Sequence, residues 1–205
     1  MNLKELYIKW KIRNGKAVLI ELEGAYPAAE LSNECYNNFR FEEINCRCME
    51  AFLYALKVQN PKRQREICTE NGEYAREWTT EDWQKEQVLW WKGKELNRHS
   101  SDFAQLIKNG YEAMFYWSPR FRDALMSTEG KELLSCRMGN DPCKTVLTDQ
   151  EFTDVLTELR ESKKEEYHRH RGRYPSMWPN CVGTDEDYAG SSIYNPSLRR
   201  SESQK

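Results

Sequence analysis

The sequence lacks a long apolar run. No segment approaches the roughly 18 consecutive apolar residues of a membrane-spanning helix, which excludes that class of protein. Residues 1–6 include a lysine and a glutamate, whereas a secretory signal peptide has an apolar stretch. We therefore expect a cytoplasmic protein with no membrane partner, whose thiols are free.

A strong excess of one charge is also absent. The chain has 31 Lys and Arg against 33 Asp and Glu, which leaves a formal net charge of −2. Because acids and bases nearly cancel, no sequence-independent attraction to nucleic acid or to anionic lipid follows. The partner therefore need not be a polyanion.

The seven cysteines lack the spacing of a structural metal site. Cys46 and Cys48 are separated by one residue, as are His168 and His170, and no two cysteines form Cys-x-x-Cys. Gly130-Lys131 has neither the upstream glycine nor the downstream Ser or Thr of a phosphate-binding loop. We expect buried or incidental thiols, no metal and no cofactor.

The chain is long enough for one domain, which we place at residues 1–161. Apolar periodicity stops after Arg160, so residues 162–205 are predicted to form an irregular charged tail. Trp178, Tyr188 and Tyr194 indicate that parts of this tail dock on the domain.

The domain is predicted to be α+β and predominantly helical. Two apolar runs, at residues 6–12 and 17–22, flank Asn14-Gly15, a dipeptide preferred in two-residue turns, and predict a short N-terminal β-hairpin. Apolar residues at steps of three and four predict helices elsewhere. They are expected from Cys48 to Asn60, from Trp83 to Trp91, from Phe103 to Phe115, after Ser118-Pro119, and from the Thr148–Glu151 capping box to Arg160, with a polar surface segment at residues 62–80.

Glu50, Tyr54 and Lys57 stand four and three residues apart on the helix predicted after Cys48. Side chains at this spacing project from one face of a helix. Spacing alone favours a solvated face with a weak Glu–Lys interaction by about two to one.

A second motif precedes this helix, because Ser32-Asn33 lies in a predicted loop and Glu50 follows Asn33 by seventeen residues. The sequence here resembles the NADAR superfamily, the YbiA-like proteins. Their members carry Ser-Asn-Phe and, at this same spacing, Ser/Thr-Glu-His-Tyr-x-Gln-Ala-x-Lys. The matching residues are Ser32, Asn33, Glu50, Phe52, Ala55 and Lys57. Weaker likeness extends over about residues 25–160.

Three positions depart from the family pattern. Glu34 replaces an aromatic residue, Ala51 replaces His, and Tyr54 replaces Gln. All three lie beside Glu50 and Lys57, which match. The resemblance therefore supports bond cleavage better than it identifies the substrate.

The resemblance implies a YbiA-like single domain that hydrolyses an N-glycosidic bond. Its implied substrate is an ADP-ribosylated or ribosylated nucleobase, such as ADP-ribosylated guanine, with modified nucleic acid as one form. A hydrolase of ribosylated pyrimidine intermediates of riboflavin synthesis is one alternative. A non-catalytic module that binds ADP-ribose or a nucleotide is the other.

Glu50 and Lys57 are the candidate catalytic residues. A carboxylate can stabilise an oxocarbenium-like state or activate water, and a lysine freed of its proton can attack C1 of an opened ribose to form a Schiff base. Asn33 would hold ribose hydroxyls, with bracing of its own loop as the alternative. The other expected substrate-binding residues are Ser32, Tyr54, Trp90 stacked on the base, Arg98 on a phosphate, and Asp141. Trp90 and Trp91 have core packing as the alternative role, and Arg98 a surface position.

Overall fold

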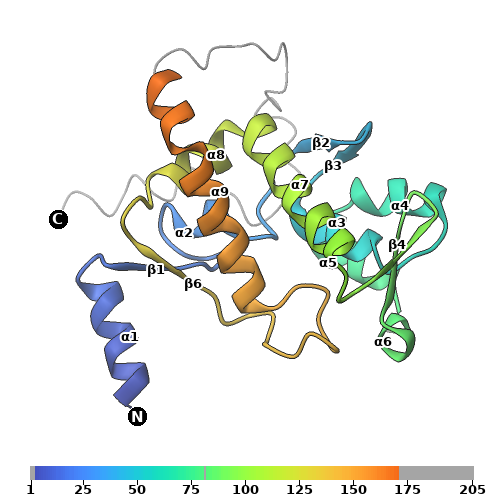
Figure 1. Ribbon diagram of the computed structural model, residues 1–205, viewed down its shortest axis with the longest axis horizontal. Coiled ribbons are helices and arrows are strands. Elements are labelled where there is room, and N and C mark those ends of the chain that lie inside the picture. The colour runs from blue at the N-terminus through green and yellow to red at the C-terminus, as the bar shows by residue number, and fades with distance from the viewer. Residues whose placement is uncertain (1–2, 81, 171–205) are drawn as a thin grey trace. The chain divides into compact units, whose positions relative to one another are not determined.

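A computed structural model of the chain describes residues 3–80 and 82–170. It is predominantly helical with short strands, which confirms the predicted α+β class (Figure 1). The helices are α1 (Leu3–Arg13), α2 (Ala28–Leu31), α3 (Met49–Ala55), α4 (Pro61–Cys68), α5 (Gly72–Glu77), α6 (Trp83–Glu86), α7 (Ser101–Trp117), α8 (Pro119–Met126) and α9 (Asp149–His170). The strands are β1 (Ala17–Leu19), β2 (Phe39–Phe41), β3 (Ile44–Cys46), β4 (Val88–Trp91), β5 (Lys94–Asn97) and β6 (Glu132–Leu134). In these ranges β1 pairs in parallel with β6, while β2–β3 and β4–β5 are antiparallel.

The core is built around α3, in which Glu50 and Tyr54 are half-buried and the other five residues are buried. Phe52 on the inner side meets Phe41 of β2 and Trp91 of β4 edge-on, at ring-centroid distances of 5.6 and 5.0 Å. Such edge-to-face pairs add to the free energy gained by apolar burial. The buried side of α3 thus fixes the direction in which its two polar residues point.

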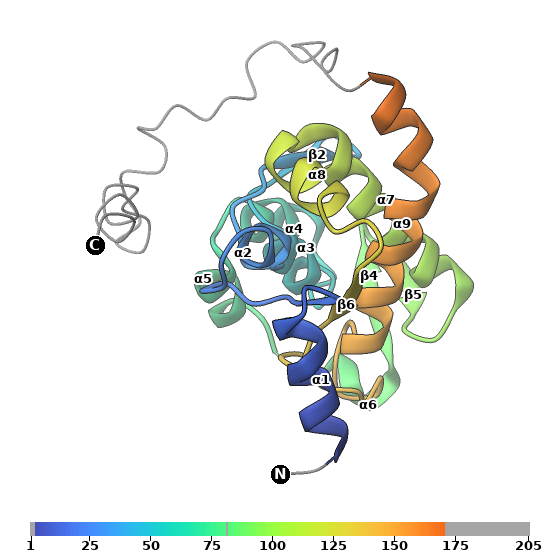
Figure 2. The ribbon, with the colours of Figure 1, turned by 90° about the vertical axis from the view of Figure 1, so that its left-hand side faces the viewer.

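Helix α7 lies between α3 and α9 (Figures 1 and 2). It comes close to α3 at Gly110, where a Cβ atom would stand 3.2 Å from Cε1 of Phe52. Its predicted apolar stripe is confirmed, and so is the capping box of α9, in which Thr148 and Glu151 accept hydrogen bonds from each other's amides. The predicted start of α8 at Ser118-Pro119 is also confirmed, because Ser118 accepts from the Phe121 amide.

The predicted N-terminal β-hairpin is wrong, since α1 occupies most of that segment and β1 pairs with β6. Asn14-Gly15 instead ends the helix. The Lys16 amide donates to the Lys11 carbonyl at 2.8 Å, and Gly15 has a φ of 67°. This is a Schellman cap, which uses the same left-handed glycine as a tight hairpin, so the dipeptide cannot distinguish the two.

The helix predicted from Trp83 to Trp91 is wrong in its second half. Helix α6 stops before Gln87, whose φ of 56° is left-handed, and the chain continues as β4. Lys92-Gly93, both with positive φ, then form the tight turn to β5. Periodicity does not separate a short apolar strand from a buried helix.

Residues 62–80 contain α4 and α5 rather than the predicted surface segment. The Asn60 side chain accepts hydrogen bonds from the amides of Lys62 and Arg63, and Pro61 fits the first turn. Asn60-Pro61 therefore begins a helix. The preceding helix, α3, ends earlier than predicted, at Ala55.

Helix α9 continues to His170, so residues 162–170 are helical rather than irregular. This last part of α9 is rich in charged side chains and has no apolar stripe, so apolar periodicity does not predict it. Residues 171–205, including Trp178, Tyr188 and Tyr194, lie outside the described part, and the expected docking of the tail stays a prediction.

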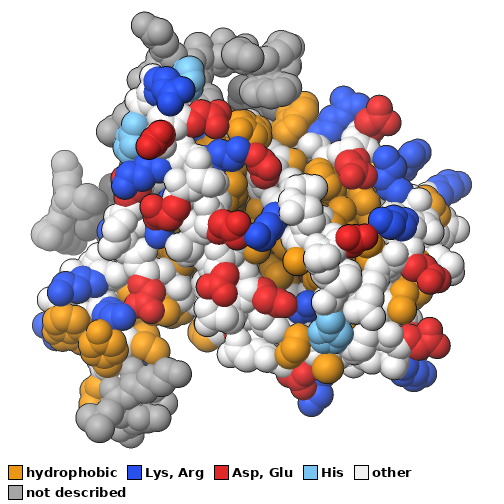
Figure 3. Space-filling model, in the orientation of Figure 1, with side chains coloured by type: hydrophobic (Ala, Val, Ile, Leu, Met, Phe, Trp, Pro, Cys, Tyr) orange, Lys and Arg blue, Asp and Glu red, His pale blue; other side chains and the backbone are white. Residues whose placement is uncertain are grey.

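Charges of both signs are interspersed on the face shown in Figure 3, in keeping with the net charge of −2. Apolar side chains gather at its lower left, over α1. Three of them, Leu6, Tyr7 and Trp10, are exposed.

We expect Gly110→Ala to lower the free energy of unfolding by about 1 kcal/mol, measured by urea denaturation. Alanine would gain about 1 kcal/mol in helix propensity. Its methyl group would press on Phe52, which Phe41 and Trp91 hold in place, and overpacking costs about 1–3 kcal/mol. Asn109→Ala, at an exposed position of α7, is the control and should be neutral within about 0.5 kcal/mol. Equal effects of the two substitutions would contradict the close packing of α7 on α3.

Candidate active site

Asn33 joins the predicted loop to the core. Its Oδ1 accepts a 2.7 Å hydrogen bond from the Tyr111 hydroxyl of α7, and its Nδ2 lies 3.6 Å from the Met138 sulfur. Its carbonyl accepts from the Glu50 amide at 2.8 Å. The two motif residues, seventeen positions apart in sequence, are therefore directly bonded.

The first turn of α3 is closed by two acceptors. The Asn33 carbonyl takes the Glu50 amide, and the Cys48 sulfur accepts from the Ala51 amide at 3.4 Å. Burial raises the pKa of the Cys48 thiol to about 12, so the sulfur stays neutral. With these amides bonded, the start of the helix and the backbone of Glu50 are fixed.

Glu50 has little room around its side chain. A Cβ atom at Gly72, the first residue of α5, would lie 2.9 Å from Cγ of Glu50 and 3.9 Å from Cγ of Glu34. Only a glycine permits α5 to approach so closely. Glu34 and Glu50 thus border the same glycine, and two carboxylates stand near each other.

The pKa of Glu50 is raised. Burial is the main cause, and the negative charge of Glu34 adds to it. A hydrogen bond from Tyr54 and the positive charges of Lys57 and Arg137 act in the opposite direction. A carboxyl group with a raised pKa in a polar cluster is suited to taking and returning a proton.

Lys57 is not on the helix that carries Glu50, which corrects the prediction. Helix α3 ends at Ala55, and the Lys57 amide bonds the Tyr54 carbonyl in a tighter turn. The ammonium nonetheless lies 4.7 Å from the centre of the Tyr54 ring, and its charge acts on Glu50. The three predicted side chains are thus brought together by α3 and the turn after it.

Ser32 and Trp90 are bonded to residues next to this group, Ser32 through its side chain and Trp90 through its backbone. The Ser32 hydroxyl accepts from the Glu34 amide at 3.4 Å, and the Trp90 amide donates to the carbonyl of Leu56, next to Lys57. The Trp90 indole nitrogen is buried and has no hydrogen-bond partner within the ranges that the structure covers. Its stacking on a base stays a prediction, whereas Trp91 belongs to the core.

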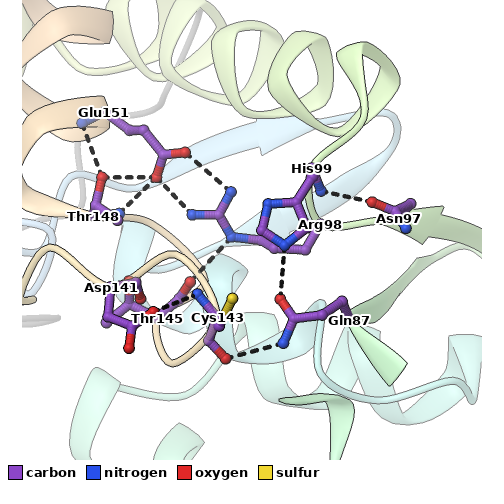
Figure 4. A network of polar contacts seen from close by, with 9 residues as sticks. All are labelled: Gln87, Asn97, Arg98, His99, Asp141, Cys143, Thr145, Thr148 and Glu151. Carbon is purple, nitrogen blue, oxygen red and sulfur yellow. Dashed lines mark hydrogen bonds and ion pairs between the residues drawn. The ribbon is translucent and has the colours of Figure 1, made fainter. Parts of the chain in front are cut away.

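Arg98 lies in a different polar network, drawn in Figure 4. Its guanidinium is buried and bonds both carboxylate oxygens of Glu151, at 3.0 and 2.6 Å, and the Thr145 carbonyl at 3.0 Å. This pair joins the end of β5 to the start of α9. To bind a phosphate, as the sequence suggested, the guanidinium would first have to leave Glu151.

Asp141 belongs to the same network, as an exposed turn residue. Its carboxylate accepts from the Cys143 amide at 3.0 Å, and its carbonyl accepts from the Thr145 amide. The residues drawn in Figure 4 include neither Glu50 nor Lys57. The structure thus brings Asn33, Glu50, Tyr54 and Lys57 together, and places Arg98 and Asp141 in a second cluster.

Asn33, Glu50, Tyr54, Lys57 and the residues that contact them or whose charge acts on Glu50 form what we call the Glu50 cluster. Three of its residues are not predicted from the sequence, namely Gly72, Tyr111 and Arg137. Apolar periodicity places Tyr111 in the buried stripe of α7 and does not reveal that its hydroxyl needs a partner there. Burial raises the pKa of that hydroxyl, which therefore stays a hydrogen-bond donor to Asn33. No local pattern marks Gly72 or Arg137, because each meets the site only through the tertiary fold.

In residues 3–80 and 82–170, no three His, Cys, Asp or Glu side chains form a group that could hold a metal ion. The six cysteines in those ranges are free thiols. No helix of the described chain has the length and apolar character needed to cross a membrane.

We expect Arg98→Met to lower the free energy of unfolding by about 1–3 kcal/mol at pH 7, because hydrogen bonds to a buried charge are lost. Burial raises the pKa of Glu151, but the bonds from Arg98 prevail and hold it below its usual range. The stability this pair provides is therefore lost as pH falls through the lowered pKa. The deficit of the variant should shrink below about pH 4 in chemical denaturation. A deficit independent of pH would contradict the ion pair.

We expect Glu50→Gln to be more stable than the natural protein at pH 8. Because the folded-state pKa of Glu50 is raised, its contribution is most favourable below the unfolded pKa and is lost as pH rises through the folded value. The advantage of the variant should therefore vanish near pH 4, measured by thermal unfolding. Glu95→Gln, at an exposed position of β5, is the control and should show no such change. A destabilised Glu50→Gln at pH 8 would argue against an unfavourably buried carboxylate.

The chain is similar in sequence to known proteins. The family described as bacteriophage protein GP30.3 matches residues 25–161, more than half of the chain. An uncharacterized 17.1 kDa protein from the Gp30-rIII intergenic region of Enterobacteria phage T4 is 34% identical over 146 residues, covering 67% of this chain and 92% of that protein.

Among solved structures, the NMR structure of the E. coli protein YbiA is similar, with a TM-score of 0.52 at 17% identity. The match covers 78% of this chain and 95% of that one. At this identity the likeness shows the fold alone, which is YbiA-like, as the sequence predicted. The match over residues 25–161 includes Asn33, Glu50 and Lys57, and the chain belongs to the bacteriophage protein GP30.3 family.

Proposed function

We propose that this protein is an N-glycoside hydrolase of the NADAR type. It removes ADP-ribose, or ribose phosphate, from a nucleobase-type nitrogen such as that of ADP-ribosylated guanine, in the cytoplasm. The observation that carries the proposal is Glu50, a carboxyl group with a raised pKa that is bonded through its amide to Asn33 and lies within the field of Lys57.

Glu50 acts on the bond to be broken. Cleavage of an N-glycosidic bond passes through an oxocarbenium-like state. A carboxylate can stabilise the positive charge of this state, or it can activate the water that attacks it. The hydrogen bond from Tyr54 orients the carboxylate. Backbone bonding to Asn33 keeps it in register with the loop that would hold the ribose hydroxyls.

Lys57 is the candidate nucleophile. While C1 still carries the base, opening of the ribose ring leaves C1 as the carbon of an iminium to the base nitrogen. The neutral amine adds to C1, the bond from C1 to the base nitrogen breaks as that nitrogen takes up a proton, and a Schiff base between C1 and Lys57 remains. The nearby carboxyl group of Glu50 can exchange the protons that these steps require. Water then hydrolyses the Schiff base and returns the lysine.

The test is incubation with ADP-ribosylated guanosine and with a ribosylated pyrimidine intermediate, followed by chromatography of the released base. We expect release from the guanosine conjugate and a loss of about 10²–10⁴-fold in kcat for Glu50→Gln. Release from the pyrimidine alone would favour the riboflavin-intermediate hydrolase. Binding without release from either would favour the non-catalytic module and contradict hydrolysis.

Borohydride trapping separates the role of Lys57 from that of Glu50. A Schiff base would be reduced to a stable secondary amine, and labelling should disappear in Lys57→Arg. Lys62→Arg, at an exposed position of α4, is the matched control and should label normally. Persistent labelling in Lys57→Arg would exclude Lys57 as the nucleophile.

A further inference from the structure

The loop after β6 places the guanidinium of Arg137 at the edge of the Glu50 cluster. Hydrogen bonds to Asp149 hold this loop in place. The buried carboxylate of Asp149 accepts from the amides of Arg137, Met138 and Gly139, at 3.1, 3.2 and 2.9 Å. It also accepts from the Ser135 hydroxyl at 2.5 Å. Four donors on one carboxylate fix the path of the loop. Met138 in turn contacts Asn33, so the loop is held by Asp149 of α9 on one side and contacts the site on the other.

Arg137 reaches from this loop to Glu34. Its Nη2 lies 3.2 Å from Oε1 of Glu34, and the two side chains are 53% and 38% exposed. Glu34 borders Gly72 beside Glu50, so the pair lies next to the candidate catalytic carboxyl group. The charges of both partners act on Glu50.

This ion pair is easily opened. Exposed pairs contribute about 0–1 kcal/mol, because water solvates the separated charges. A guanidinium binds a phosphate through two parallel hydrogen bonds, and a phosphate can carry more charge than a carboxylate. A phosphate-bearing ligand can therefore replace Glu34 at little cost. The negative charge of Glu34 would repel an anionic ligand that does not form hydrogen bonds with Arg137.

We propose that Arg137 is an anion subsite beside Glu50, which binds a phosphate of the substrate and is occupied by Glu34 when the substrate is absent. The substrate is then a phosphorylated ribosyl conjugate rather than a simple nucleoside. Because Arg98 is held by Glu151, Arg137 replaces it as the phosphate-binding residue. The assignment of a substrate rests on the proposed function, whereas the anion subsite can be tested without turnover.

The test measures binding of ADP-ribose and of adenosine by calorimetry. Arg137→Gln should weaken ADP-ribose binding by about 10- to 100-fold and leave adenosine binding unchanged, because only the first ligand has phosphates. Glu34→Gln should tighten ADP-ribose binding several-fold, since the competing carboxylate is gone. Arg63→Gln is the control, because Arg63 forms an equally exposed pair with Glu66 at 3.1 Å.

Three results would overturn the subsite. The first is ADP-ribose binding by Arg137→Gln within twofold of that of the natural protein. The second is the absence of ADP-ribose binding by the natural protein at millimolar concentration. The third is an equal loss of ADP-ribose and adenosine binding in Arg137→Gln, which indicates a structural role. If ADP-ribose binding depends on Arg137 but no substrate is hydrolysed, the anion subsite is supported and the proposed function is rejected. Where hydrolysis occurs, Arg137→Gln should raise KM by a larger factor than it changes kcat.

A pH profile adds a measurement that a purely structural role would not affect. Glu34 raises the pKa of Glu50, and Arg137 lowers it. The limb of the pH–rate profile due to Glu50 should therefore move to lower pH in Glu34→Gln and to higher pH in Arg137→Gln. Shifts in the same direction would contradict the placement of this pair beside Glu50.

Discussion

The hydrogen bonds of Asn33 hold the candidate site to the core. Its side chain satisfies the buried Tyr111 hydroxyl in the middle of α7, while its carbonyl receives the Glu50 amide at the start of α3. Leaving either group buried and unbonded would cost about 1–3 kcal/mol. Bracing is thus the role that the contacts of Asn33 show, while its binding of ribose hydroxyls stays a prediction, since Oδ1 and Nδ2 already face Tyr111 and Met138. The same residue can fix the loop and orient the carboxyl group beside it.

Electrostatics around Glu50 are balanced rather than optimised for stability. Burial and Glu34 oppose its ionisation, while Tyr54, Lys57 and Arg137 favour it. A surface carboxylate would need none of these neighbours. The net effect is a raised pKa, which makes the carboxyl group better suited to taking up and returning a proton. The ionised form of Glu50 therefore lowers the stability of the fold, and the same surroundings give its carboxyl group the raised pKa that the proposed chemistry uses.

Local signals predicted some elements well and others poorly. Helices α7, α8 and α9 carry their own caps and apolar stripes, so their starts could be read from Ser118 and from the Thr148–Glu151 box. The failure at Asn14-Gly15 arises because one left-handed glycine ends a helix or turns a hairpin equally well. The failure at Trp83 to Trp91 arises because apolar periodicity does not separate a short strand from a buried helix. The resemblance to the NADAR superfamily, carried by the distance from Asn33 to Glu50, predicted that Asn33, Glu50 and Lys57 share a site, and the structure brings the three residues together. Arg137 could not be found this way, because only the pairing of β6 with β1 and the clamp of Asp149 bring it near Glu34.

Asp149 is both the first residue of α9 and the acceptor for the loop that reaches Asn33. The first turn of the helix and this loop therefore stabilise each other. Opening the first turn of α9 would release the amides of residues 137–139, and a ligand held by that loop would oppose such opening. Occupancy of the site should thus be visible in slowed amide hydrogen exchange at the start of α9, a helix whose far end lies some 30 Å away.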